Sequence, residues 1–178
     1  MDRKNLIHSF RSYQTNFEEE KRFIDSFLAL LNHKDCFQRT HLPGHITGSA
    51  WMVNGDRTKT LLVHHAKLNK WVQPGGHADG DENILNVALR EAEEETGLKN
   101  LKPFTTIFDV DIHKIPARKD FPEHFHYDIR FLTEADETEK IIVSDESHDV
   151  KWVSMNELEN FTMERSVLRM KDKLLPDG

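Results

Sequence analysis

The pattern of apolar and polar positions predicts helices over about the first forty residues. Between Phe23 and Leu31, apolar residues recur at intervals of three and four, which is the spacing of an amphipathic helix. Residues 15–18 fit a capping box, in which Thr15 and Glu18 satisfy free N–H groups at the start of this helix. A helix with one broad apolar face must cover another surface, so we expect it to flank the same domain or to form a homodimer contact.

From about residue 45 the pattern changes to one that is typical of strands. Residues 46–53 and 60–65 are rich in apolar and β-branched side chains, and the turn-forming residues 54–56 separate them. Residues 83–95 have the period of a helix, and Gly97 suits the left-handed position that closes one. We predict further strands over 105–112, 126–133 and 150–153, and a helix over 155–175.

This order of elements predicts the fold class and its division. Strands with a helix between them and helices at both ends indicate an α/β fold, in which helices cover a mixed sheet. The 178 residues suit one domain, with no internal repeat or long linker to divide it. Within residues 1–178 we expect a helical N-terminal extension over 1–40, a core over 41–161 and a C-terminal helix over 162–178.

Charge and apolar runs exclude two classes of partner. Lys and Arg total 24 against 31 for Asp and Glu, whereas a protein that binds a nucleic-acid polymer needs a basic face. No apolar run reaches the roughly 18 residues of a membrane-spanning helix, and the polar N-terminus lacks the apolar stretch of a secretory signal. We therefore expect a cytoplasmic protein whose partners include no nucleic-acid polymer and no membrane.

Side chains that bind borderline metals show no matched spacing. Cys36 is the single cysteine, so the chain offers no thiol pair for a zinc site. Several of the eleven histidines cluster, at positions 64–65, His113, His124 and His126. His124 and His126 alternate on one face of a predicted strand. Without matched partners, the pattern favours neutral rings that line a pocket over metal ligands.

Three glutamates in the predicted central helix point to a hard cation. Glu91, Glu94 and Glu95 have i, i+3, i+4 spacing, which places them on one helix face, where like charges repel. A divalent cation with oxygen ligands offsets this repulsion. Arg90 can pair with Glu94 four residues later, and the bare backbone at 75–76 offers a carbonyl nearby. An isolated acidic run is usually a solvated face, but this one follows a further glutamate and two glycines at fixed distances.

The segment from Gly76 to Leu98 resembles the Nudix box. That pattern is Gly, five residues, Glu, seven residues, then Arg-Glu-apolar-any-Glu-Glu-any-Gly-apolar. Every position is matched here, by Gly76, Glu82, Arg90, Glu91, Ala92, Glu94, Glu95, Gly97 and Leu98. The resemblance implies an α/β/α sandwich with the box as a loop–helix–loop, and residues 1–40 extend beyond the family's usual core.

The resemblance also implies a metal site and a reaction. Glu91, Glu94 and Glu95 would hold Mg²⁺ or Mn²⁺ together with the Gly75 carbonyl, and Arg90 would orient a metal-binding glutamate. The cations would neutralise the diphosphate, lower the pKa of a bound water and align that water for attack on phosphorus. Under this mechanism no covalent enzyme intermediate forms.

Two further carboxylate roles follow from the same resemblance. Glu82 would support the loop of the box structurally. Some family members place a catalytic-site glutamate in a loop shortly before a tryptophan-bearing strand, which favours Glu146, six residues before Trp152. Glu123 is the alternative, and Glu146 could also be part of a solvated acidic turn. The expected catalytic residues are therefore Arg90, Glu91, Glu94 and Glu146.

The function that the resemblance predicts is that of a hydrolase. It would cleave the diphosphate linkage of a nucleoside diphosphate joined to another group, such as a nucleotide sugar or an ADP-ribose-like compound. The alternative is a nucleoside triphosphate pyrophosphatase. An isopentenyl diphosphate isomerase-like enzyme is more remote, because those enzymes use a cysteine in the loop that here reads Pro74-Gly75-Gly76. A non-catalytic Nudix sensor is also remote, because such a module would be expected to lose carboxylates from the box, and this one has lost none.

Residues outside the box leave the substrate open. Relatives that act on ADP-ribose often carry a proline about fifteen residues after the box, where this chain has His113 and Lys114, with Pro116 slightly late. The tyrosine of relatives that act on dinucleoside polyphosphates is absent from that place. The basic segment 113–119 either reaches a substrate phosphate or forms a solvated loop.

Overall fold

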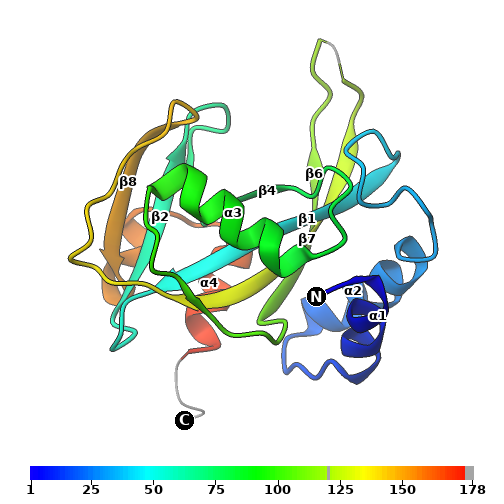
Figure 1. The fold of residues 1–178 in the computed structure, drawn as a ribbon, viewed down its shortest axis with the longest axis horizontal. Helices are drawn as coiled ribbons and strands as arrows, with labels where there is room; N and C mark the ends of the chain where they lie inside the picture. Colours follow the sequence, from blue (N-terminus) through cyan, green and yellow to red (C-terminus); the bar gives the residue numbers. More distant parts are fainter. Residues whose placement is uncertain (120, 175–178) are drawn as a thin grey trace. The chain divides into compact units, whose positions relative to one another are not determined.

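The N-terminal region forms two helices, as predicted, in the computed structural model, which describes residues 1–119 and 121–174 (Figure 1). Helix α1 covers Arg3–Ser12, and helix α2 covers Glu18–Leu30. The predicted capping box before α2 is wrong. Phe17 is the N-cap and makes no side-chain cap bond, because the Thr15 hydroxyl donates instead to the carboxylate of Glu20.

Eight strands of the described residues form one sheet, which confirms the predicted α/β class with a mixed sheet. The hydrogen-bonded order is β3-β2-β1-β7-β5, while β4 pairs with β1, β6 with β7 and β8 with β2. The strands are β1 (Gly44–Val53), β2 (Lys59–His65), β3 (Lys70–Val72), β4 (Gly75–His77), β5 (Lys102–Pro103), β6 (Asp109–Ile115), β7 (His124–Glu134) and β8 (Ser147–Ser154).

The segment 155–175 is helical for the most part, as predicted, but it is not one continuous helix. A 3-10 helix, η1, covers Met155–Asn160, and helix α4 covers Arg165–Asp172. Between them the Thr162 hydroxyl accepts the backbone N–H of Glu164, a local bond that competes with a continuous helix. The end of the predicted segment, from residue 175, lies outside the described residues. No helix among those that the structure describes is long and apolar enough to cross a membrane.

Backbone contacts divide the chain into two units, each with its own apolar core. One unit comprises Met1–Ser49, Gly76–Ala88 and Thr105–Phe131, and the other comprises Ala50–Gly75, Leu89–Phe104 and Leu132–Gly178. In the first, Phe10 of α1 stacks on Phe27 of α2 with ring centroids 4.6 Å apart. In the second, a core gathers residues from β1, β2, β8, helix α3 (Ile84–Thr96) and the segment after α3, among them Ala50, Met52, Leu61, Val63, Ala92, Leu98 and Val150.

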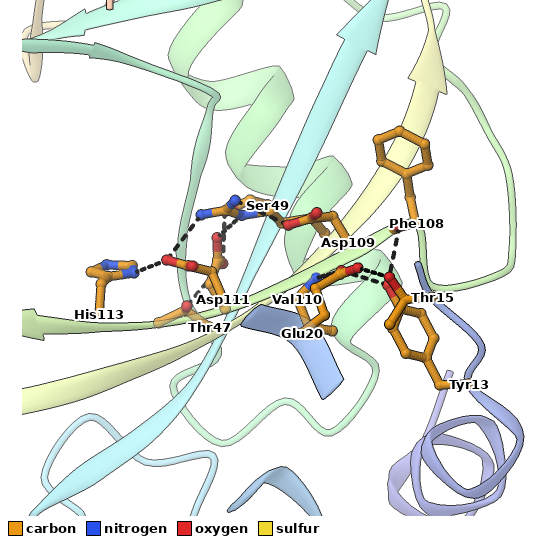
Figure 2. A network of polar contacts seen from close by, with 12 residues as sticks. Tyr13, Thr15, Glu20, Thr47, Ser49, Phe108, Asp109, Val110, Asp111 and His113 are labelled. Atoms are coloured by element: carbon orange, nitrogen blue, oxygen red, sulfur yellow. Dashed lines mark hydrogen bonds and ion pairs between the residues drawn. The ribbon is translucent and has the colours of Figure 1, made fainter. Parts of the chain in front are cut away.

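A buried ion cluster lies inside the first unit (Figure 2). The guanidinium of Arg130 contacts the carboxylates of Asp128 at 2.7 Å, Asp109 at 3.1 Å and Asp111 at 3.5 Å. Thr47 and Ser49 donate to Asp128 from the neighbouring strand. Burial disfavours the charge of the guanidinium, but the three carboxylates outweigh it and raise the pKa of Arg130. Such a cluster fixes the alignment of β1, β6 and β7.

Candidate active site

Helix α3 presents its glutamates because its other face is anchored. Ile84, Val87, Ala88 and Ala92 are fully buried, and they recur at the spacing of one helix face. The close approach of β1 is visible at Gly48, where a Cβ would lie 3.0 Å from the Ile84 side chain. The helix face that remains carries the acidic residues of the box.

The helix ends at Gly97, as the sequence predicts. Gly97 has a φ of +76°, in the left-handed region that favours glycine, and its N–H donates to the carbonyl of Glu93. A Cβ at this position would lie only 2.6 Å from the Cβ of Ile142. The backbone conformation at this position therefore requires glycine, and Ile142 packs directly against it.

Glu95 is the buried carboxylate of the site. It is 7% exposed, and its Oε2 accepts the backbone N–H of Gly75 at 3.0 Å. Burial raises the pKa of Glu95 to about 8, and the charges of Glu91, Glu146 and Glu94 add to this. A carboxylate in this environment favours a bound proton or a nearby cation.

Glu91 is the second low-exposure carboxylate. Its side chain is 19% exposed, and burial raises its pKa, with Glu94 and Glu146 contributing in the same direction. The Nη2 of Arg90 lies 2.6 Å from Glu91, whereas its Nε lies 4.0 Å from Glu94. Arg90 thus orients Glu91, and its expected pairing with Glu94 is the looser of the two contacts.

The two candidates for a further carboxylate have different surroundings. The charge of Glu146 raises the pKa of both Glu91 and Glu95, so Glu146 lies within electrostatic reach of the box glutamates. Its backbone carbonyl accepts from the N–H of Ala66, which anchors this loop to the end of β2. Glu123 instead forms an ion pair with Lys114 at 2.8 Å, across the β6–β7 hairpin.

The loop before the box is held by main-chain bonds. The carbonyl of Pro74 accepts from the N–H of Ala50 in β1 at 3.0 Å, and the next N–H, that of Gly75, is the one that Glu95 accepts. The bare backbone of Gly75 is therefore fixed beside the glutamates of α3. Its carbonyl and the three carboxylates are hard oxygen donors, and Arg90 offsets only one negative charge, so the donor set fits a divalent cation such as Mg²⁺.

Glu82 has a structural contact in the first unit. Its Oε1 accepts two bonds from Arg3, at 2.8 Å from Nη2 and 3.1 Å from Nε. The same guanidinium donates to the carbonyls of Leu31, His33 and Lys34. Glu82 thus connects the loop of the box with the N-terminal region through Arg3. This contact is consistent with the structural role that the resemblance implies for Glu82.

The structure brings together histidines that the sequence leaves apart. His124 and His126 face one another, with their Nε2 atoms 3.2 Å apart, as their alternation on β7 predicts. His45 and His77 join them, with ring centroids 4.9 Å from that of His126, and neither belongs to the histidine cluster that the sequence indicates. Burial lowers the pKa of His45 to about 4 and that of His126 to about 2, so both rings are neutral near pH 7.

Comparison with known proteins agrees with this architecture. The NUDIX domain model matches residues 44–174. A probable DHNTP pyrophosphohydrolase of Lactococcus lactis is 28% identical over 138 residues, which cover 76% of this chain and 81% of that protein. An m7GpppN-mRNA hydrolase of Danio rerio is 44% identical over 61 residues, which cover 32% of this chain and only 20% of that protein.

Solved structures share the fold. The Ap4A hydrolase of C. elegans, in a binary complex, superposes with a TM-score of 0.58 at 16% identity, over 72% of this chain and 93% of that one. A NUDIX-family hydrolase from Clostridium perfringens has a TM-score of 0.58 at 23% identity, over 73% of this chain and 95% of that one. The shared region excludes about a quarter of this chain.

Proposed function

This chain belongs to the Nudix family and is a pyrophosphohydrolase that acts on acid anhydrides, and we propose that it cleaves the diphosphate linkage of a nucleoside diphosphate joined to another group. Water attacks one phosphorus, the bridging P–O bond breaks, and the products are a nucleoside monophosphate and the phosphorylated second group. The substrate is a small molecule, in keeping with a net charge of -7 that disfavours a nucleic-acid polymer.

One observation carries this proposal: two low-exposure carboxylates of α3, Glu91 and Glu95, interact electrostatically, and the backbone of Gly75 is bonded to one of them. Glu95 is buried and bonded to Gly75, Glu91 is held by Arg90, and Glu146 raises the pKa of both glutamates. A site with this excess of negative charge does not bind a diphosphate by itself. It binds a polyanion once cations stand between the carboxylates and the phosphates.

The family is typically dependent on divalent metals, and we infer Mg²⁺ or Mn²⁺ as the ion, held by Glu91, Glu94, Glu95 and the carbonyl of Gly75. Such an ion, when bound, neutralises phosphate oxygens and lowers the pKa of a water. The protein's own groups position the reaction. Arg90 fixes the rotamer of Glu91, and the N–H of Gly75 fixes that of Glu95.

Glu146 completes the proposed site. Its charge acts on Glu91 and Glu95 from a loop outside the helix. We assign to it one of two roles: it orients the attacking water and accepts that water's proton, or it serves as an additional metal ligand. Glu123 has no such role in this proposal, because it is engaged with Lys114.

A second substrate class has an observation in its favour. The relative from Lactococcus lactis that matches over most of both chains is named a probable DHNTP pyrophosphohydrolase. By analogy, the second candidate is hydrolysis within a nucleoside triphosphate, which releases a nucleoside monophosphate and pyrophosphate. The same carboxylates would serve both reactions, so the choice depends on residues that bind the leaving group.

A substrate screen tests the proposal. Purified protein with Mg²⁺ or Mn²⁺ is incubated with nucleotide sugars, ADP-ribose, nucleoside triphosphates, dinucleoside polyphosphates and an m7GpppN cap analogue, with products separated by chromatography. Glu94→Gln serves as the matched inactive control. A nucleoside monophosphate and a sugar phosphate from a nucleotide sugar or ADP-ribose support the first candidate. Pyrophosphate from triphosphates alone selects the second, and no turnover of any diphosphate overturns the proposed function.

A further inference from the structure

A cluster of histidine rings lies in the unit that carries the N-terminal helices, and the proposed hydrolysis does not use it. His45 on β1, His77 on β4 and His126 on β7 each offer a ring nitrogen, and these nitrogens lie within 4.8 Å of one another. We propose that the three histidines bind a transition-metal ion, Zn²⁺ or a similar borderline divalent cation. Its ligands are distinct from the glutamates of α3.

The protonation pattern of His45 supports a ligand role. This side chain is fully buried, and its Nδ1 lies 3.3 Å from the carbonyl oxygen of His41. A carbonyl only accepts, so Nδ1 carries the hydrogen and Nε2 carries a lone pair. Among the residues that the structure describes, Nε2 is buried without a hydrogen-bond partner. Histidines that bind metals commonly have this arrangement, with one nitrogen donating to a carbonyl and the other facing the ion.

A second lone pair faces the cluster from His124. Its Nδ1 lies 2.9 Å from the carbonyl oxygen of Pro122, so the hydrogen is on Nδ1 and Nε2 is an acceptor. That Nε2 lies 3.2 Å from Nε2 of His126, and two facing lone pairs need a proton or a cation between them. A proton on His126 satisfies the pair in the metal-free protein. A shared metal ion satisfies it equally well, which makes His124 a candidate fourth ligand.

The distances are compatible with a tetrahedral ion after small side-chain movements. With Zn–N bonds of about 2.0–2.1 Å, the ligand nitrogens of a tetrahedral site stand about 3.3 Å apart. The three nitrogens must therefore approach one another by about 1.5 Å at most. Ring centroids of His45, His77 and His126 lie 4.9 to 5.2 Å apart, so rotation of the rings within the cluster suffices.

The chemistry of the donors selects the class of ion. Imidazole suits Zn²⁺, Co²⁺, Ni²⁺ and copper, whereas Mg²⁺ prefers oxygen donors. The buried ion cluster described above extends to His113, whose Nδ1 donates to Asp111 at 3.1 Å (Figure 2). The His113 ring lies 5.4 Å from that of His126, so the cluster reaches the rim of the histidine site. This carboxylate adds a negative charge that favours a cation.

The ligands come from three strands whose positions in the sequence are far apart. A bound ion therefore connects segments around residues 45, 77 and 126, and it binds only the folded chain at full strength. Binding of this kind raises the apparent stability in proportion to the logarithm of the free metal concentration. A thermal shift thus reports occupancy of the histidine site without reference to catalysis.

The experiment is a titration of metal-free, untagged protein with Co²⁺ and then Zn²⁺, in excess Mg²⁺ so that the oxygen donors of α3 are occupied. We expect the intense visible absorption of tetrahedral Co²⁺, its displacement by Zn²⁺, and a rise in the melting temperature with Zn²⁺. His126→Gln and His77→Gln should each weaken binding by more than about tenfold. His148→Gln is the control, because His148 packs on His64 outside the cluster.

Two results would overturn the proposal. The first is Co²⁺ that keeps the weak spectrum of the octahedral aqua ion while Zn²⁺ leaves the melting temperature unchanged. The second is binding that both cluster variants retain at full strength, with circular dichroism confirming that they fold. In either case the histidines are neutral packed rings only. Mg²⁺-dependent hydrolysis is measured on the same Zn²⁺-free samples, so failure of this site and failure of the proposed function are separately visible.

Discussion

The backbone N–H of Gly75 donates a 3.0 Å hydrogen bond to the carboxylate of Glu95, twenty residues further along the chain. This bond joins the loop before the box to the helix that carries the glutamates. It satisfies one lone pair of a carboxylate that burial would otherwise disfavour, and it holds the backbone of Gly75 against Glu95. The geometry of the site therefore depends on one main-chain contact as well as on charged side chains.

Exchange of Glu146 for glutamine tests the carboxylate outside the box. We expect Glu146→Gln to lower the maximal rate by about a hundredfold, within the usual range for one positioned acid–base group, with less effect on substrate binding. Glu123→Gln is the matched control and should keep its rate, because Glu123 is paired with Lys114. Steady-state kinetics in saturating Mg²⁺ measure both. If Glu123→Gln had a strongly lowered maximal rate and Glu146→Gln a normal one, the role would belong to Glu123.

Gly97 provides a test of the helix terminus. Gly97→Ala should destabilise the protein by about 2 kcal/mol or more, because alanine strains the left-handed backbone and its Cβ would meet that of Ile142 at 2.6 Å. Gly55→Ala is the control, because nothing lies within 4 Å of a Cβ there. Urea unfolding gives both free energies. Equal stabilities for the two variants would show that the positive φ of Gly97 carries no cost.

The contact between Arg3 and Glu82 tests the role of the N-terminal helices. Arg3→Met removes the donor of bonds to Glu82 and to three carbonyls, and it should cost roughly 1–2 kcal/mol of stability. Glu82→Gln should cost less, because the amide oxygen still accepts and the ion pair is partly exposed. Turnover per folded molecule should stay near normal in both. A large fall in the maximal rate of folded Glu82→Gln would make Glu82 part of the reaction instead.

Cys36 should be chemically silent in the native state. The side chain is fully buried, and burial raises the pKa of its thiol from 9.0 to about 11, so the native protein holds roughly a hundredfold fewer thiolates than the unfolded chain at pH 8. Because the folded state retains the proton, the contribution of Cys36 to stability falls as the pH rises from about 9 to 11. Labelling with an aromatic disulfide reagent checks this, with and without urea. Equal native and unfolded labelling rates would place the thiol at the surface.

The box and its helix were predictable from the sequence because their signals are local. The spacing of Glu91, Glu94 and Glu95 defines one helix face, and Gly97 marks its end without any tertiary information. The sequence also predicts a strand over 150–153, which the structure extends to Ser147–Ser154. The assignment of these residues to catalysis and metal binding stays a prediction that kinetics must test.

Other features depend on contacts between distant segments. Strands β3, β4 and β5 have two or three residues each, too few to show a period of two, and pairing with longer strands creates them. The bond from Thr15 to Glu20 displaced the expected capping box because Glu20 also accepts the N–H of Val110 in β6. His45 and His77 lie far apart in the sequence, and only the pairing of β4 and β7 with β1 brings their rings close to that of His126.

The most direct test of the central claim is the Mg²⁺ dependence of turnover in Glu95→Gln and Glu94→Gln. Each should lower the maximal rate by at least about a hundredfold and weaken Mg²⁺ activation, while the metal-free fold stays as stable as the parent or slightly more so, because a repelling charge is removed. Glu93→Gln is the control on the same helix, since Glu93 pairs with Lys99 at 3.1 Å. Near-normal turnover of either box variant at limiting Mg²⁺ would contradict the account.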